Sequence, residues 1–276
     1  MVLLTAAILA ASPSDPRAAA PGAGSAAGSL PAAGSAAGAG ESTPADGSAT
    51  VEIALRTHDG HAFSGLYASP PSSGSNALLV VPDLGQKRDH FLRLVASLRA
   101  RGYRVLSMDN TGQLRQVKRG PNAMPTFTPM STKILDVLVQ DVGSGLTGLR
   151  AQPGVGRVGI LGFGIGANAA LLAAGDDPTV AVVAAVVPNY GCDEFDPYAA
   201  FGDMNSRPVL LAESKKKYHS DISIAFEHIM AKRKDLPLQH VALKRDSEDL
   251  TQRDLEEDYE DAVLAWLDKA FPSASH

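Results

Sequence analysis

Residues 157–170 read RVGILGFGIGANAA, and three local patterns follow one another in this stretch. Arg157–Leu161 is mainly apolar, which is typical of a strand buried on both faces of a parallel sheet. Residues 162–166, GFGIG, form a glycine-rich turn, and the alanines and leucines of Ala167–Ala174 favour a helix. The stretch therefore predicts a strand–turn–helix unit, the element from which α/β proteins are built.

The rest of the chain repeats this alternation of strands and helices. An opening hairpin is predicted at 51–57 and 62–68, joined by the turn His58-Asp59-Gly60. Further strands are expected at 76–81, 103–108, 180–187, 208–212 and 238–243, helices at 88–101, 131–150, 222–232 and 254–270, and a long loop at 111–129. This order predicts an α/β fold with a mostly parallel eight-stranded sheet and helices on both faces.

Composition divides the 276-residue chain into three parts. Residues 1–11 form an apolar run that is too short to span a bilayer, which takes about 20 residues, but has the length of a signal-peptide core. Residues 12–50 are almost entirely Ala, Gly, Ser and Pro, and such a segment buries too little apolar surface to fold. We therefore expect a disordered linker before one folded domain at 51–271. An exported protein, periplasmic or extracellular, is favoured over a cytoplasmic one, and no transmembrane segment is expected.

Charge and cysteine content narrow the function classes further. The net charge of -5 gives no reason to expect a nucleic-acid partner. Cys192 is the single cysteine, so neither an intrachain disulfide nor a cysteine-based metal site can form. His58, Asp59 and His61 are interpreted as a hairpin turn in preference to a metal site. No cofactor and no metal is expected.

The turn at 162–166 partly satisfies two known motifs. Gly162, Gly164 and Ala167 fit the dinucleotide-binding pattern G-x-G-x-x-G/A, and the turn also fits the nucleophile elbow G-x-S-x-G except at its reactive position, Gly164. A dinucleotide site normally follows the first strand of its domain, with an acid at the end of the next strand. Here several strands precede the turn, and the nearest acid, Asp193, lies well beyond the next strand. The position after a central strand favours the elbow.

Three further segments resemble the α/β-hydrolase fold superfamily, in particular dienelactone hydrolases and serine esterases. VVPDLGQ (80–86) stands where that family has an H-G-x-G oxyanion turn. RGYRVLSMDNTGQ (101–113) looks like R-G-Y-x-V-x-x-x-D-x-R-G-x-G, and VLAWLDKAF (263–271) matches the usual last helix. The resemblance covers nearly all of 51–271. It implies hydrolysis of ester or amide bonds by a nucleophile, an acid and a histidine, in that chain order.

The residues at all three positions of this triad depart from the family's pattern. Gly164 provides no nucleophile. Where the family has its acid the chain reads ESKKK, and the nearest carboxylate, Glu213, comes about two positions early. The histidine region 244–251 contains no histidine, and Asp249 is its closest equivalent. His240 lies in the preceding strand and is interpreted as a packed or edge residue.

The oxyanion-like backbone donors remain, because Leu84 and Ile165 can each direct an N–H group toward the elbow. The carboxylate of Asp83 would oppose a developing negative charge there. We interpret the protein as a degenerate, catalytically inactive hydrolase with a binding or structural role, and a small molecule or protein in the cleft above Gly164 as its partner. An active esterase or peptidase using atypical residues is the alternative. A third hypothesis gives the domain a purely structural role, with 12–50 as a spacer.

Overall fold

The computed structural model describes residues 50–110, 132–192, 195–217, 220–234, 238–245, 250 and 253–273. All of these belong to one compact unit of the chain. The predicted segment 1–11, nearly all of 12–50 and the loop expected at 111–129 lie outside the described residues.

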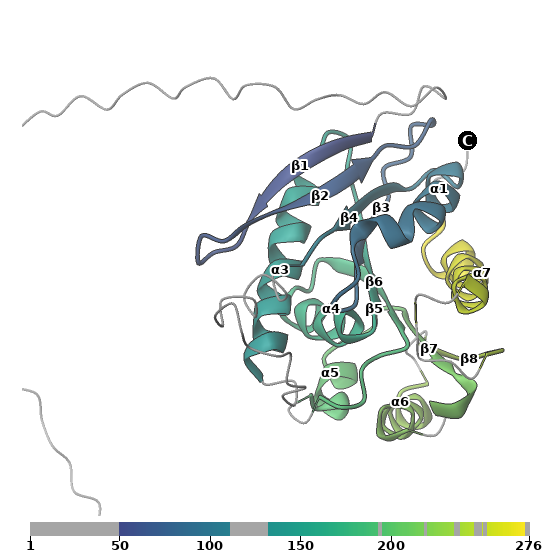
Figure 1. Cartoon of the computed structure of the whole chain (residues 1–276). Coiled ribbons are helices and arrows are strands. Elements are labelled where there is room, and N and C mark those ends of the chain that lie inside the picture. The colour runs from purple at the N-terminus through teal and green to yellow at the C-terminus, as the bar shows by residue number, and fades with distance from the viewer. Residues whose placement is uncertain are drawn as a thin grey trace, which may run out of the picture. The chain divides into compact units, whose positions relative to one another are not determined.

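An eight-stranded sheet forms the centre of this unit (Figure 1). Its strands are β1 (Thr50–Arg56), β2 (Ala62–Ala68), β3 (Ala77–Val81), β4 (Arg104–Met108), β5 (Val158–Phe163), β6 (Val180–Val186), β7 (Val209–Ser214) and β8 (Leu238–Leu243). They lie in the order β1-β2-β4-β3-β5-β6-β7-β8. The pairs β1–β2 and β2–β4 are antiparallel and the other pairs are parallel. The mostly parallel sheet with an opening hairpin is thus confirmed.

The described helices follow the strands as the sequence predicts, with one addition. They are α1 (Leu92–Ala100), α3 (Thr132–Arg150), α4 (Ile165–Asp176), α5 (Pro197–Gly202), α6 (Asp221–Lys232) and α7 (Arg253–Ala270), with short 3-10 turns η1 (Arg88–Phe91) and η2 (Lys215–Lys217). Helix α5 was not predicted. Its start is set by Asp196, whose side chain accepts hydrogen bonds from the backbone N–H groups of Tyr198 and Ala199, and by proline at the first helical position.

Two hydrophobic cores cover the two faces of the sheet, because successive strand residues point to opposite sides. In β3, Leu79 packs into the core shared with α3, α4, α5 and α6, whereas Leu78 and Val80 pack into the core shared with α1 and α7. Figure 1 shows α1 and α7 on the same side of the sheet. Each strand residue of β3 is fully buried, which explains the continuous apolar run.

The topology brings together two loops that are distant in the sequence. Strands β3 and β5 are parallel neighbours at the centre of the sheet, with Val81 opposite Gly162. The loop after β3 and the turn after β5 therefore leave the same edge side by side. Among the described helices, none has the length and hydrophobicity needed to cross a membrane.

Candidate functional site

The glycine turn after β5 adopts a conformation that only glycine accepts easily. Gly164 has φ 56° and ψ -129° and directly precedes helix α4. A residue bearing a Cβ would be strained in this region by about 1–3 kcal/mol. Gly166 is required for a different reason, because a Cβ there would meet the backbone of Val81 and Pro82. The turn is therefore pressed closely against the loop that follows β3.

That loop places the Asp83 carboxylate at the start of helix α4. Its Oδ1 atom accepts hydrogen bonds from the backbone N–H of Leu84, at 2.8 Å, and from that of Ile165, at 2.9 Å. Gly164 has no side chain with which to cap α4, so Asp83 supplies the missing acceptor from 82 residues away. The two N–H groups that the sequence predicted as oxyanion-like donors are thus bonded to an oxygen of this chain.

The same carboxylate fills the space that a side chain at position 164 would need. A Cβ added to Gly164 would overlap the carboxyl carbon and both oxygens of Asp83. The sequence indicated only that Asp83 would repel an anion. The structure places the carboxylate against both the donors and the elbow, so Asp83 and Gly164 fit together as a pair.

Several contacts fix the position of Asp83 and shift its pKa. Its backbone carbonyl accepts hydrogen bonds from Asn110 Nδ2, at 3.2 Å, and from the backbone N–H of Gln86, at 3.1 Å. Burial raises the pKa of Asp83 above the ordinary value of an aspartate, and the two N–H donors lower that pKa by less. The positive end of the α4 dipole also favours a negative charge at this point.

The acid-position candidate, Glu213, is fully buried near the end of β7 and belongs to a separate cluster of polar side chains. Its carboxylate accepts hydrogen bonds from Tyr190 Oη at 2.8 Å, Ser220 Oγ at 3.0 Å and Ser223 Oγ at 2.5 Å. The Nε2 atom of His240 lies 2.6 Å from Glu213 Oε2. These four groups come from β8, the start of α6 and the loop after β6, so Glu213 joins three parts of the fold.

His240 is a buried partner of this cluster. The sequence interpretation allowed a packed or an edge residue. In the structure His240 is both an edge residue and a packed one. It belongs to the outermost strand β8, and its side chain is only 5% exposed. Its Nδ1 atom lies 3.3 Å from Glu227 Oε1 of α6, and its ring packs edge-on against Phe226. The ring therefore lies between two carboxylates and is held against α6.

The remaining sequence candidates are placed as follows. Asp249, the closest equivalent of the histidine, and Asp193 lie outside the described residues. Lys215 and Lys216, which follow Glu213 in the ESKKK segment, are exposed. In the described part of the chain no three His, Cys, Asp or Glu side chains come together in a way that could hold a metal ion.

Two further groups of residues that the sequence analysis discussed belong to local structure. Asp59 and His61 form a pair with 3.7 Å between Oδ2 and Nε2 in the turn between β1 and β2. Cys192 is buried, with 6% of its surface exposed, and belongs to the core on the α3–α6 face. Asp59 and His61 are thus part of the hairpin turn, and Cys192 is part of the packed interior.

Comparison with known proteins connects this geometry to a family. The model of the dienelactone hydrolase family matches residues 63–236, which is more than half of the chain. An esterase from Pyrococcus furiosus has a similar structure, with a TM-score of 0.58 and 16% identity, over 80% of this chain and 92% of that one. A dienelactone hydrolase from Anabaena variabilis has a TM-score of 0.56 and 16% identity, over 79% of this chain and 96% of that one.

A longer protein also shares the fold. An acylaminoacyl peptidase from Pyrococcus horikoshii gives a TM-score of 0.61 at 14% identity and covers 82% of this chain but 42% of its own. At such low identities these likenesses show the fold alone. A comparison with curated protein sequences gave no match.

Proposed function

Because the chain belongs to the dienelactone hydrolase family, we propose that it keeps the family's fold while carrying out no ester or amide hydrolysis at the elbow, and that it acts by binding or as a structural protein. Covalent hydrolysis at an elbow needs a nucleophile on the turn and two N–H donors available to the developing oxyanion. Here the turn carries Gly164, and the donors Leu84 and Ile165 are bonded to Asp83.

The Asp83 contact is the observation that carries the proposal. Loss of one donor from an oxyanion hole costs about 2.7–4 kcal/mol of transition-state stabilisation in hydrolases. In this chain both donors are taken by one oxygen of Asp83. An incoming carbonyl oxygen would have to displace a carboxylate, and the substrate's own negative charge would develop next to it.

The Glu213 cluster supports the same conclusion. A triad acid orients a histidine whose other nitrogen faces the nucleophile. His240, the partner of Glu213, has its second ring nitrogen 3.3 Å from Glu227 Oε1. The two ring nitrogens thus face Glu213 of β7 and Glu227 of α6, which suits a structural role for this pair.

A direct assay tests the proposal. The purified chain is offered p-nitrophenyl esters of short acids and peptide p-nitroanilides, and is treated separately with a fluorophosphonate probe. Asp83→Asn is the matched control, because its amide oxygen still accepts from both N–H groups without a charge. We expect no probe labelling, and any residual turnover should be the same in the two proteins because it comes from a contaminant.

Two outcomes would contradict the proposal. One is turnover by the natural chain that changes in Asp83→Asn, which would place the reaction at the elbow. The other is stoichiometric labelling of a single peptide by the probe. Either would favour the alternative, an active esterase or peptidase that uses atypical residues.

A further inference from the structure

One oxygen atom of the Asp83 carboxylate is not used by the fold. The backbone N–H groups of Leu84 and Ile165 both donate to Oδ1, and within the described residues Oδ2 accepts no hydrogen bond. The shift in the pKa of Asp83 comes from burial and these two donors alone, so no described cationic side chain is paired with it. Because Asp83 is half-buried, part of the residue faces solvent and Oδ2 is available to a ligand.

A second acceptor beside Asp83 also lacks a donor. Asn110 is buried, and its Nδ2 atom donates to the backbone carbonyl of Asp83 at 3.2 Å. Its Oδ1 atom, on the same amide carbon, is fully enclosed and accepts no hydrogen bond from the described residues. Buried amide oxygens nearly always have a partner, and an exception calls for an explanation. Since Nδ2 is held against Asp83, the unsatisfied Oδ1 lies beside Asp83 as well.

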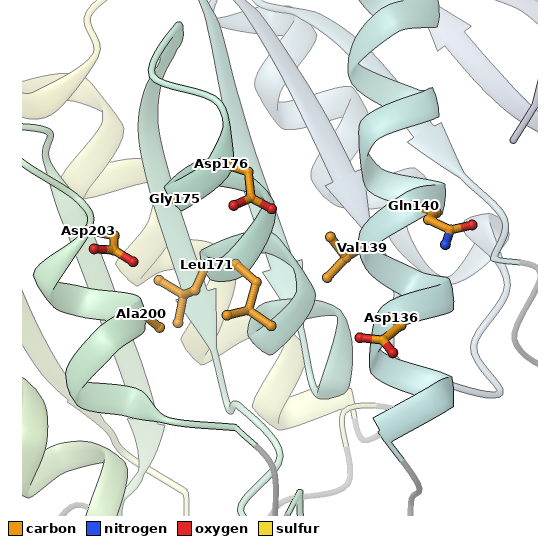
Figure 2. A pocket seen from close by; sticks show the side chains of 9 residues that line it. Asp136, Val139, Gln140, Leu171, Gly175, Asp176, Ala200 and Asp203 are labelled. Carbon is orange, nitrogen blue, oxygen red and sulfur yellow. The ribbon is translucent and has the colours of Figure 1, made fainter. Parts of the chain in front are cut away.

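Carboxylates elsewhere on the surface do not create the same need for a ligand. Figure 2 shows Asp136, Asp176 and Asp203 around a hollow of about 420 Å³ on helices α3, α4 and α5. All three are exposed to water, and the Arg207 guanidinium interacts electrostatically with Asp203. Exposed charges are hydrated and gain little from pairing. Burial raises the pKa of Asp83, because its negative charge is less well solvated than theirs.

The two acceptors at the elbow select one kind of donor. A guanidinium group pairs best with both oxygens of a carboxylate, but Oδ1 of Asp83 is already engaged. A divalent metal ion needs several oxygen ligands, and in the described residues no three acidic, histidine or cysteine side chains gather to hold one. A primary ammonium group carries three N–H donors on one atom. It can therefore pair with a carboxylate oxygen and donate to an amide oxygen at the same time.

We propose that the elbow recognises a primary ammonium group, which pairs with Asp83 Oδ2 and donates a hydrogen bond to Asn110 Oδ1. This inference rests on the binding role proposed above and names the chemical group that is bound. Free alkylamines and lysine side chains both present such a group. Neutral ligands of the same size lack the charge and are not bound.

Titration followed by ¹⁵N nuclear magnetic resonance tests the proposal at the site itself. The full chain is labelled with ¹⁵N-leucine and ¹⁵N-isoleucine, because the N–H groups of Leu84 and Ile165 donate to Asp83 and report on its carboxylate. The probes are butylamine and Nα-acetyl-lysine methylamide, with butanol as the neutral comparison. We expect an amine to shift both resonances and butanol to shift neither. A response to butylamine alone identifies a free amine as the source, and a response to the lysine derivative alone identifies a lysine side chain.

Three variants assign the binding to the two acceptors. Asp83→Asn should weaken the amine about tenfold or more, because it removes the charge from the pair. Asn110→Leu should weaken the amine about two- to tenfold, because one hydrogen bond is lost. Asp109→Asn is the matched control, since it removes a neighbouring carboxylate that faces Arg88, with 3.6 Å between Oδ2 and Nη1, and should change the affinity less than about twofold. The spectrum of each variant confirms that it is folded.

The pH dependence of binding gives a second check on the natural chain. Affinity for the amine should rise as pH increases from about 4, because Asp83 then loses its proton and gains the charge that the ammonium group needs. Absent amine binding, equal shifts with butanol, unchanged affinity in Asp83→Asn and Asn110→Leu, or equal weakening in Asp109→Asn would overturn the proposal. None of these outcomes restores hydrolysis, whereas ester turnover that changes in Asp83→Asn contradicts the proposed function and leaves amine binding to be judged by the titration.

Discussion

Asp83, which is partly buried, and Glu213, which is fully buried, are two carboxylates that the fold satisfies in different ways. Asp83 accepts from two backbone N–H groups, which are present whatever side chains their residues carry. Glu213 accepts from three hydroxyl groups and faces the ring of His240, all of which belong to side chains. The elbow therefore tolerates a change at Asp83 that keeps an acceptor. The Glu213 cluster depends on five side chains together.

The largest effect is expected from breaking the Glu213 cluster. Glu213→Ala removes the common acceptor of the cluster, so three hydroxyl groups each lose one hydrogen bond. Each intramolecular hydrogen bond contributes about 0.5–1.5 kcal/mol, so loss of the four contacts of Glu213 should lower the free energy of unfolding, measured with urea, by about 3–5 kcal/mol.

A variant of a second carboxylate that faces His240 serves as the control for Glu213→Ala. Glu227 also faces His240, but its side chain is 49% exposed. Glu227→Gln should cost less than about 1 kcal/mol, as for an exposed ion pair. If Glu213→Ala cost no more than Glu227→Gln, the cluster would not stabilise the fold in the way we describe.

A smaller effect is expected at the elbow. Gly164→Ala introduces a Cβ into a left-handed conformation and against the Asp83 carboxylate. We expect a loss of about 2 kcal/mol, from backbone strain and from the displaced carboxylate. Urea unfolding of this variant measures the loss.

A double variant separates the two causes. In Asp83→Gly the space beside position 164 is empty, so adding Gly164→Ala should cost less there than in the natural chain. A coupling of about 1 kcal/mol between the two changes is expected for residues in direct contact. Strictly additive losses would show that Asp83 does not occupy this space in solution.

The smallest effect is the pH dependence contributed by Asp83. Its pKa is raised in the folded chain, mainly by burial, so the folded state binds this proton more tightly than the unfolded chain does. The resulting stabilisation is complete below the unfolded pKa, about 3.9 for aspartate, and is lost as pH rises through the folded pKa. Asp83→Asn should therefore gain stability relative to the natural chain as pH rises from about 4 toward neutrality.

Urea unfolding of both proteins across this pH range measures the difference. Asp109→Asn is the comparison variant, because it removes a half-exposed carboxylate that faces the Arg88 guanidinium, with 3.6 Å between Oδ2 and Nη1, and lies outside the elbow. If the stability of Asp83→Asn relative to the natural chain fell with rising pH, the assigned direction of the pKa shift would be wrong.

Short sequence patterns predicted most of the fold, because strands, turns and helices depend largely on residues that are close together in the chain. The apolar run of β3, the glycine turn at 162–166 and the helix after it required no knowledge of distant contacts. Helix α5 was missed because it is short, although Asp196 and Pro197 are a recognisable start signal for a helix. The prediction at Asp249 stays a prediction, since that residue lies outside the described part of the chain.

The contacts of the candidate site could not be predicted in the same way. Glu213 and His240 are 27 residues apart, and they meet because β7 and β8 pair with Leu211 opposite His240. That register places Glu213 two residues along the same face.

The sequence alone determined the α/β order of the elements, the glycine at the elbow and the absence of a nucleophilic side chain at that position, because each depends on residues within one short stretch. Only the tertiary structure decided that the Asp83 carboxylate occupies the two N–H donors. The reason is that β3 and β5 are neighbours in the sheet but 82 residues separate Asp83 from Ile165, and a hydrogen bond between them exists only once the sheet has formed.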